Sequence, residues 1–131
     1  MTPESKARDH MRRDLVTFTP EMDIHRAIKL LLKHRISGGP VVDAEGRLVG
    51  ILSKKDCLKV AFSASYHGDW GGPVAEYMTK DVETIEGTTG IVEVAEMFLQ
   101  RPYRRFPVME DGRLVGQISR HDILKALEKL W

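Results

Sequence analysis

Two short segments of the chain place a serine and an aspartate three residues apart, Ser53 with Asp56 and Ser119 with Asp122. Each pair follows an apolar segment predicted to be a strand and stands where a helix is predicted to begin. The free N–H groups and the positive dipole at a helix start favour phosphate. The serine hydroxyl adds a donor, and the carboxylate can accept from two neighbouring ribose hydroxyls. The spacing therefore predicts binding of a phosphorylated sugar.

The same pairs also have a structural interpretation, as capping boxes. In a capping box the two side chains satisfy the N–H groups of their own helix start. For one such serine–aspartate pair taken alone, this structural interpretation is favoured. Two such pairs related by an internal two-fold axis would instead place both carboxylates at a common cleft, which favours a role in binding. Both roles stay open from sequence alone.

Three arginines, Arg101, Arg104 and Arg105, precede a predicted strand in the second half of the chain. Their guanidinium groups can hold a phosphate in a bidentate arrangement, or they can form a solvated basic edge that discourages aggregation. The matching segment of the first half, Arg35–Gly39, has one arginine and two glycines. We therefore expect two unequal sites, with the Asp122 site better suited to anions.

Pro40 and Pro107 lie next to these segments. Proline cannot donate to a strand ladder, so each marks an edge, a strand start or a bulge. Backbone groups nearby are then free to meet the base of a ligand, although each proline is equally compatible with a purely structural strand start.

No constellation for catalysis or for metal binding is visible. The single cysteine, Cys57, aligns with Ile123 of the second half, which indicates a small apolar residue in a helix face. The five histidines show no paired spacing typical of metal ligands, and His121, inside the second Ser-x-x-Asp segment, is the one placed to touch a ligand. No nucleophile elbow, phosphate-binding Walker loop or dinucleotide fingerprint occurs. We expect no catalytic residue, no metal and no cofactor.

An internal repeat positions these residues. Residues from Met11 to Val41 match residues from Met78 to Val108 at an offset of 67, and the offset then becomes 66. Gly46–Gly50 and Gly112–Gly116 have the same five letters, and the two Ser-x-x-Asp segments follow them at equal distances. A single duplicated unit therefore occupies nearly the whole chain.

Each copy predicts the same elements in the same order. Short strands are expected at 15–18 and 82–85, and helices are expected where apolar residues recur at helical spacing. The two predicted buried stripes are Ile24, Ala27, Ile28, Leu31 and Leu32, and Ile91, Val94, Ala95, Phe98 and Leu99. Hairpins are expected at 40–52 and 106–118, followed by helices from about 54 and 120.

The fold class is therefore mixed α/β (α+β), with two β-α-β-β-α motifs packed about a pseudo-two-fold axis. We expect a first motif at 7–60, a linker at 61–77 that is irregular and glycine-rich from Phe62 to Val74, and a second motif at 78–130. One motif alone has too few elements to bury both faces of its sheet, so we expect the two to share a core.

Composition narrows the classes of function. The 131 residues are 42% hydrophobic and 30% charged, with a formal net charge of +1, so bulk charge does not favour nucleic acid as a partner. Apolar runs are far shorter than the roughly 20 residues that span a bilayer, the first ten residues lack the apolar core of a secretory signal, and one cysteine requires no oxidising compartment. We expect a cytoplasmic protein with no membrane partner.

The doubled pattern resembles a pair of cystathionine-β-synthase (CBS) domains over about Ala7 to Leu130. The resemblance implies two clefts that bind adenosine-containing ligands such as AMP, ADP, ATP or S-adenosylmethionine. It also implies a module that often dimerises. The aspartates would hold the ribose hydroxyls, and the serines would lie near the phosphates. Residues near the first strand of each copy, and residues just before the strand that contains Pro40 or Pro107, would contact the base and the phosphates. Together with flanking basic residues, the candidate ligand residues are Val16, Thr17, Ser37, Gly38, Gly39, Pro40, Ser53, Lys54, Asp56, Val82, Thr84, Arg104, Arg105, Pro107, Ser119, Arg120, His121 and Asp122.

The leading hypothesis is a non-catalytic regulatory sensor of adenine nucleotides, a homodimer that acts on a separate and unknown effector protein. The alternative is a ligand-independent dimerisation or protein-interaction module, in which both Ser-x-x-Asp segments serve only as caps. Binding of RNA or single-stranded DNA through the arginines is disfavoured by the low net charge and the few aromatic residues near them. Enzymatic activity comes last.

Overall fold

The computed structural model describes residues 5–68 and 70–129, with His67 described in its backbone alone. The chain divides into two compact units. The first-copy unit is Val16–Val82, and the second-copy unit is Met1–Leu15 together with Glu83–Trp131. The beginning of the chain thus belongs to the unit that is built mainly from the second copy.

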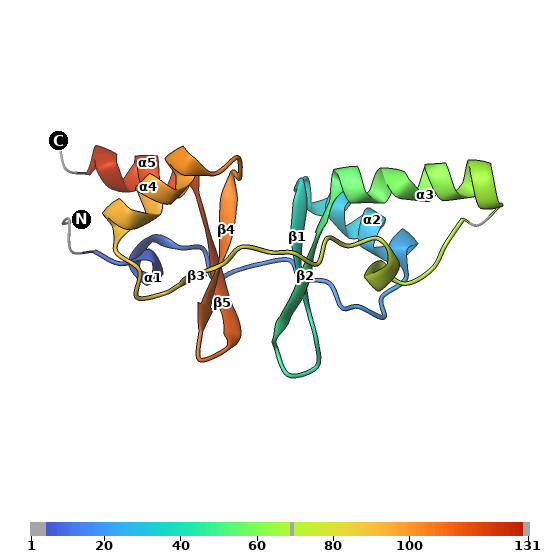
Figure 1. Cartoon of the computed structure of the whole chain (residues 1–131), viewed down its shortest axis with the longest axis horizontal. Coiled ribbons are helices and arrows are strands. Elements are labelled where there is room, and N and C mark those ends of the chain that lie inside the picture. Colours follow the sequence, from blue (N-terminus) through green and yellow to red (C-terminus); the bar gives the residue numbers. More distant parts are fainter. Residues whose placement is uncertain (1–4, 69, 130–131) are drawn as a thin grey trace. The chain divides into compact units, whose positions relative to one another are not determined.

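The first-copy unit contains four regular elements and one short 3-10 helix. They are α2 (Ile24–His34), β1 (Gly38–Val42), β2 (Leu48–Ser53), α3 (Lys54–His67) and η1 (Val74–Glu76). Strands β1 and β2 form an antiparallel hairpin in which Gly38 lies opposite Ser53. Helices α2 and α3 lie on the same side of this hairpin (Figure 1).

The second-copy unit repeats this arrangement. Its elements are α1 (Ala7–His10), β3 (Ile85–Glu86), α4 (Ile91–Gln100), β4 (Arg105–Glu110), β5 (Arg113–Ser119) and α5 (Arg120–Glu128). The sheet order is β3-β4-β5, with β3 parallel and β5 antiparallel to β4. The predicted α/β class and the β-α-β-β-α order are confirmed.

The first strand of each copy is shorter than the predicted four residues. In the first copy a single residue, Phe18, bridges Val41 in parallel, donating to the Pro40 carbonyl (3.0 Å) and accepting from the Val42 N–H (2.8 Å). In the second copy β3 is limited to Ile85–Glu86. The next backbone hydrogen bond toward the N-terminus of each first strand would need an N–H donor at Pro40 or Pro107, and proline has none. The prolines therefore end both ladders.

Two further expectations need correction. Helix α3 continues to His67, where Gly68 ends it with φ 67°, so the connection predicted to be irregular from Phe62 begins as helix. Leu32 and Leu99, predicted to be buried, are 64% and 88% exposed. Each lies at the edge of an apolar stripe whose centre alone meets the sheet.

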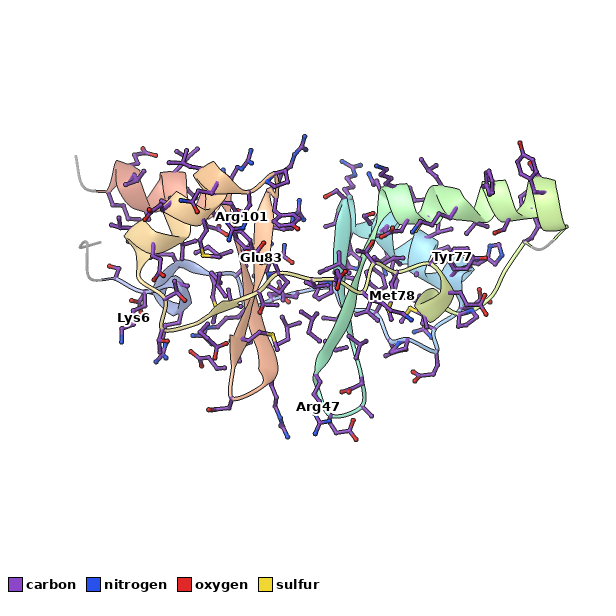
Figure 2. All side chains as sticks on the ribbon, viewed as in Figure 1. Lys6, Arg47, Tyr77, Met78, Glu83 and Arg101 are labelled. Atoms are coloured by element: carbon purple, nitrogen blue, oxygen red, sulfur yellow. The ribbon has the colours of Figure 1, made fainter. Side chains whose placement is uncertain are left out.

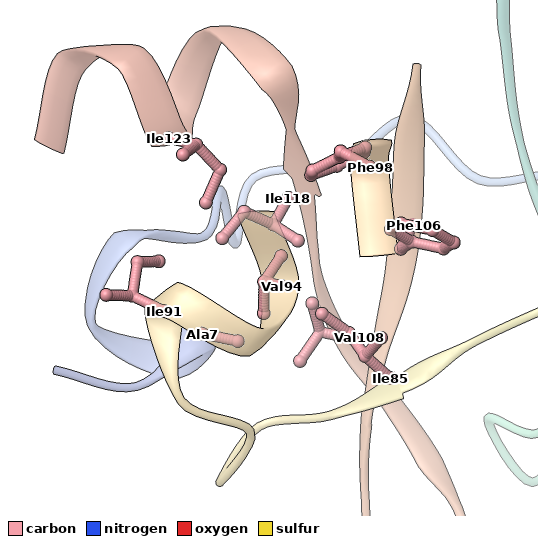
Figure 3. Packing of buried hydrophobic residues seen from close by; sticks show 9 residues of the cluster. All are labelled: Ala7, Ile85, Ile91, Val94, Phe98, Phe106, Val108, Ile118 and Ile123. Atoms are coloured by element: carbon pink, nitrogen blue, oxygen red, sulfur yellow. The ribbon is translucent and has the colours of Figure 1, made fainter. Parts of the chain in front are cut away.

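Each unit has its own hydrophobic core. In the second-copy unit Ala7, from the start of the chain, is fully buried with Ile91 and Val94 of α4 (Figure 3). The Ala7 N–H donates to the Thr89 carbonyl (2.8 Å), and the Ile91 N–H donates to the Ser5 carbonyl (2.8 Å). The core of the first-copy unit includes Phe18, Ile24, Ala27, Leu31, Val41, Leu52, Val60, Val74 and Tyr77.

The start of each copy packs on a hairpin strand of the other copy. Thr79 exchanges two backbone hydrogen bonds with Ile51 (2.9 Å each), as Arg12 does with Gln117 (2.8 and 2.9 Å). A Cβ atom on Gly50 would lie 2.7 Å from the sulfur of Met78 and 2.9 Å from the carbonyl oxygen of Thr79. Glycine is therefore required there by the close approach of another backbone, and Gly116 is approached in the same way by Met11 and Arg12.

Candidate functional site

The serine and aspartate that begin α3 hold each other in place. The Ser53 N–H donates to Oδ2 of Asp56 (3.0 Å), and the Asp56 N–H donates to Oγ of Ser53 (3.1 Å). The Ser53 hydroxyl also donates to Oδ2 of Asp56 (3.0 Å). This is a complete capping box, so the structural interpretation of the first segment is confirmed.

The start of α5 has the same geometry. The Ser119 N–H and hydroxyl donate to Oδ2 of Asp122 (2.9 and 3.0 Å), and the Asp122 N–H donates to Oγ of Ser119 (3.2 Å). In both copies the capping interactions use the Oδ2 atom of the aspartate. What distinguishes the two sites is therefore the surroundings of the other oxygen, Oδ1.

Oδ1 of Asp56 is occupied within the protein. Lys59 donates from Nζ to this oxygen (2.9 Å) and to the Tyr77 carbonyl (3.1 Å). The hydroxyl of Thr79 lies 3.2 Å from Oδ1 and 3.4 Å from Oδ2. Asp56 is 5% exposed, the one buried charged residue in the described part of the chain. Figure 2 labels Tyr77 and Met78, which belong to the segment that supplies these contacts.

The electrostatics of Asp56 reflect these contacts. Burial by itself raises the pKa of the Asp56 carboxyl, but the hydrogen bonds from Lys59 and Ser53 and the positive charge of Lys59 outweigh it. The net result is a pKa below the ordinary value of 3.8. Asp56 is therefore held as a carboxylate by its own protein neighbours.

Oδ1 of Asp122 has no such partners among the residues that the structure describes. No side chain or backbone group in the described part of the chain donates to that oxygen. Lys125, at the position that corresponds to Lys59, forms no ion pair among the described residues. Arg12 stands at the position that corresponds to Thr79, and arginine offers no hydroxyl. An acceptor oxygen thus remains at the start of α5.

In the first-copy unit the candidate residues come together. The Lys54 N–H donates to the Ser37 carbonyl (2.8 Å), which joins the start of α3 to the residue before β1. A Cβ atom on Gly39 would lie 2.7 Å from the carbonyl oxygen of Val16. The strand start, the helix start and the segment before Phe18 therefore meet, and they carry Val16, Thr17, Ser37, Gly38, Gly39, Pro40, Ser53, Lys54 and Asp56.

The second-copy unit forms the corresponding junction. The Arg120 N–H donates to the Arg104 carbonyl (3.2 Å), and Arg105 lies opposite Ser119 in the β4–β5 register. Arg104, Arg105, Pro107, Ser119, Arg120, His121 and Asp122 are thereby gathered, with Thr84 directly before β3. Val82, the remaining candidate, is the last residue of the first-copy unit.

One of the three arginines is paired with a carboxylate of its own unit. The Nε of Arg101 lies 2.9 and 3.1 Å from the two carboxylate oxygens of Glu83 (Figure 2). Arg104 is exposed, and its guanidinium has no partner among the residues that the structure describes. Glu83 therefore offsets the charge of one of the three cations that the sequence indicated.

Sequence reasoning missed Lys59, Thr79 and Tyr77. Lys59 was within reach, because Asp56 and Lys59 are three residues apart and such pairs meet on one helix face. Thr79 and Tyr77 are 23 and 21 positions from Asp56, and no local pattern connects them to it.

Three observations bear on other possible functions. Burial and the adjacent Asp56 carboxylate raise the pKa of the Cys57 thiol, which disfavours the thiolate that a cysteine nucleophile requires. Among residues 5–68 and 70–129, His, Cys, Asp and Glu side chains do not gather in threes as a metal ion would need. Every helix in that part of the chain is too short or too polar to cross a membrane.

Known proteins resemble this chain in sequence. The family model for the CBS domain matches twice, at residues 7–63 and 74–129. An uncharacterized protein of Methanocaldococcus jannaschii, MJ1225, is 28% identical over 95% of this chain and 43% of its own length. The inosine-5'-monophosphate dehydrogenase of Aquifex aeolicus is 34% identical over 84% of this chain and 22% of the enzyme. The chain thus spans less than half the length of both of these curated relatives.

The similarity to solved structures extends over nearly the whole length of both chains. The structure of CBSX2 in complex with AMP, a protein of Arabidopsis thaliana, has a TM-score of 0.83 at 26% identity and covers 96% of this chain and 98% of that one. The CBS domain pair of protein MJ0100, in complex with 5'-methylthioadenosine and S-adenosyl-L-methionine, has a TM-score of 0.77 at 28% identity. It covers 98% of this chain and 100% of that one.

Proposed function

Since the chain belongs to the CBS domain family, we propose that it is a non-catalytic regulatory module that binds an adenosine-containing ligand, namely AMP, ADP, ATP or S-adenosylmethionine. Two similar structures hold such molecules, AMP in one and 5'-methylthioadenosine with S-adenosyl-L-methionine in the other. The observation that carries the proposal is the available Oδ1 atom of Asp122 at the start of α5.

The residues around Asp122 suit the three parts of a nucleotide. Oδ1 of Asp122 accepts the ribose hydroxyls in a charge-assisted hydrogen bond. The N-terminus of α5 and the exposed guanidinium of Arg104 attract the phosphates. Pro107 supplies no N–H to the segment before β3, so backbone groups beside Thr84 remain for the base.

The module is proposed to act through a separate effector protein and not through chemistry of its own. The raised pKa of Cys57 supports this, because a protonated thiol is a poor nucleophile. A cytoplasmic location belongs to the same proposal, since a single cysteine has no need of an oxidising compartment.

The test is binding of AMP, ADP, ATP and S-adenosylmethionine to the full chain, measured by calorimetry and by thermal shift. A ligand at 100 times its Kd stabilises the folded state by about 2.7 kcal/mol, a shift of several degrees in Tm. Asp122→Asn keeps an oxygen for the cap but presents an N–H₂ group to the ribose, so binding should weaken by about 10- to 100-fold. Asp111→Asn, in the exposed β4–β5 turn, is the matched control and should bind normally.

A homodimer is the second part of the proposal. Leu58 and Leu124 occupy matching positions on α3 and α5 and are 70% and 64% exposed, and the exposed Leu32 and Leu99 form another matching pair. Apolar side chains repeated at the same positions of two copies favour an interface with a second copy of the chain. If the chain dimerises tightly yet none of the four ligands binds, the ligand-independent interaction module replaces the sensor.

A further inference from the structure

We propose that Asp56 is a structural tether and that each chain therefore takes one adenosine ligand, at Asp122. The identity of the ligand rests on the proposed function. The roles of the two aspartates rest on the difference between their hydrogen-bond partners. It assigns different roles to two residues that the repeat places at identical positions.

The first argument is the number of donors around Asp56. A carboxylate offers about four lone-pair sites. Oδ2 of Asp56 accepts from the Ser53 N–H and hydroxyl, and Oδ1 accepts from Lys59, with the Thr79 hydroxyl within 3.4 Å of both oxygens. Ribose hydroxyls would have to displace Lys59 or Thr79 before they could bind.

The second argument is burial. The side chain of Asp56 is 7% exposed in its ion pair, whereas that of Lys59 is 54% exposed. A ligand that displaced Lys59 would release its ammonium group to water, but it would still have to reach a buried carboxylate whose two oxygens are both contacted by the Thr79 hydroxyl. An uncompensated buried charge during that exchange is unfavourable.

The third argument is what the tether holds. Lys59 donates a hydrogen bond to the Tyr77 carbonyl, and the Thr79 hydroxyl donates one to the Asp56 carboxylate. The Thr79 backbone in turn forms hydrogen bonds with the backbone of Ile51. Asp56 thus fastens the segment after η1 to the start of α3.

The second copy supplies the internal comparison. Its Arg12 backbone pairs with Gln117 just as Thr79 pairs with Ile51, yet no group bridges from that segment to Asp122 among the described residues. The backbone pairing therefore does not require a tether, and the contacts of Asp56 are an addition specific to the first copy.

The test compares matched substitutions in the full chain, with AMP as the first calorimetric probe and ATP and S-adenosylmethionine as the others. We expect one ligand bound per chain, a loss of about tenfold or more in affinity for Asp122→Asn, and affinity within about twofold of the parent for Asp56→Asn. Asp56→Asn should lower Tm more than Asp122→Asn does, because it alone removes an ion pair.

Two ligands per chain, or equal losses of affinity in the two variants, would overturn the inference while leaving the proposed function intact. The absence of binding by every probe would overturn the proposed function and the single-ligand claim together. The tether itself has a ligand-free readout, the coupling of Asp56→Asn with Thr79→Val in Tm, and strict additivity would refute it. If Asp56→Asn fails to fold, Thr79→Val removes one contact of Asp56 and keeps the Lys59 ion pair, and it should lower Tm while ligand affinity stays within about twofold of the parent.

Discussion

The ammonium group of Lys59 lies 2.9 Å from Oδ1 of Asp56. The corresponding lysine of the second copy, Lys125, forms no such pair with Asp122 in the described part of the chain. Two aspartates with the same capping geometry thus differ in their remaining oxygen. That difference separates a carboxylate whose two oxygens both have protein partners from one whose Oδ1 has no donor among the described residues.

The stability of the protein should depend on pH through Asp56. Its folded-state pKa lies below the ordinary 3.8, so the unfolded chain takes up the proton first as pH falls. The stabilisation is therefore fully present above about pH 4 to 5 and is lost as pH decreases through the folded pKa. Urea unfolding at a series of pH values from 7 to 3 measures this.

The control for the pH prediction is Asp56→Asn, which has no carboxyl at this position. Its unfolding free energy should be lower than that of the parent at pH 7 and should fall less steeply between pH 5 and pH 3. Parallel curves for the two proteins would show that another group governs the acid sensitivity.

Gly50→Ala and Gly116→Ala should each destabilise the protein by about 1–3 kcal/mol, the usual effect of overpacking. At Gly50 the new methyl group would lie 2.9 Å from the carbonyl oxygen of Thr79, and at Gly116 it would lie 2.8 Å from that of Arg12. Backbone atoms cannot give way as a methionine side chain can. Chemical denaturation measures the loss, and unchanged stability in both variants would argue against the close packing of the two segments.

Gly90→Ser should stabilise the protein by a few tenths of a kcal/mol. Gly90 is the N-cap of α4 and provides no side-chain hydrogen bond, whereas Asp23, its counterpart before α2, accepts from the His25 N–H (2.9 Å). The φ of Gly90 is −64°, and a Cβ there meets nothing within 4 Å. With Glu93 three residues later the new serine would complete a capping box. A decrease in Tm would contradict this.

Leu99→Glu and Leu124→Glu should weaken the proposed dimer, because each places a charge on an exposed apolar position that the repeat presents twice. Light scattering over a range of concentrations measures the change in mass. Val92→Glu is the control, since Val92 is exposed but its counterpart in the first copy is the polar His25. The interface assignment is refuted if all three variants keep the mass of the parent.

Local patterns determined much of this protein. The repeated Gly-Arg-Leu-Val-Gly segments with their following Ser-x-x-Asp pairs were enough to predict the hairpins, the helix starts and the fold class. Capping joins residues three apart, and amphipathic spacing joins residues three or four apart, so one turn of chain contains the whole signal. The arginine cluster was visible for the same reason, although its pairing with Glu83, 18 residues from Arg101, was not.

Tertiary structure alone decided which aspartate has protein donors on both of its oxygens. The donors that surround Asp56 include Thr79, which is 23 residues away and reaches it because Met78 packs against Gly50 and the Thr79 backbone joins Ile51. The lengths of the first strands were settled in the same way, by the missing N–H groups of Pro40 and Pro107 across the ladder. Contacts between distant segments depend on the path of the folded backbone. Patterns among residues that are neighbours in the sequence contain no information about that path.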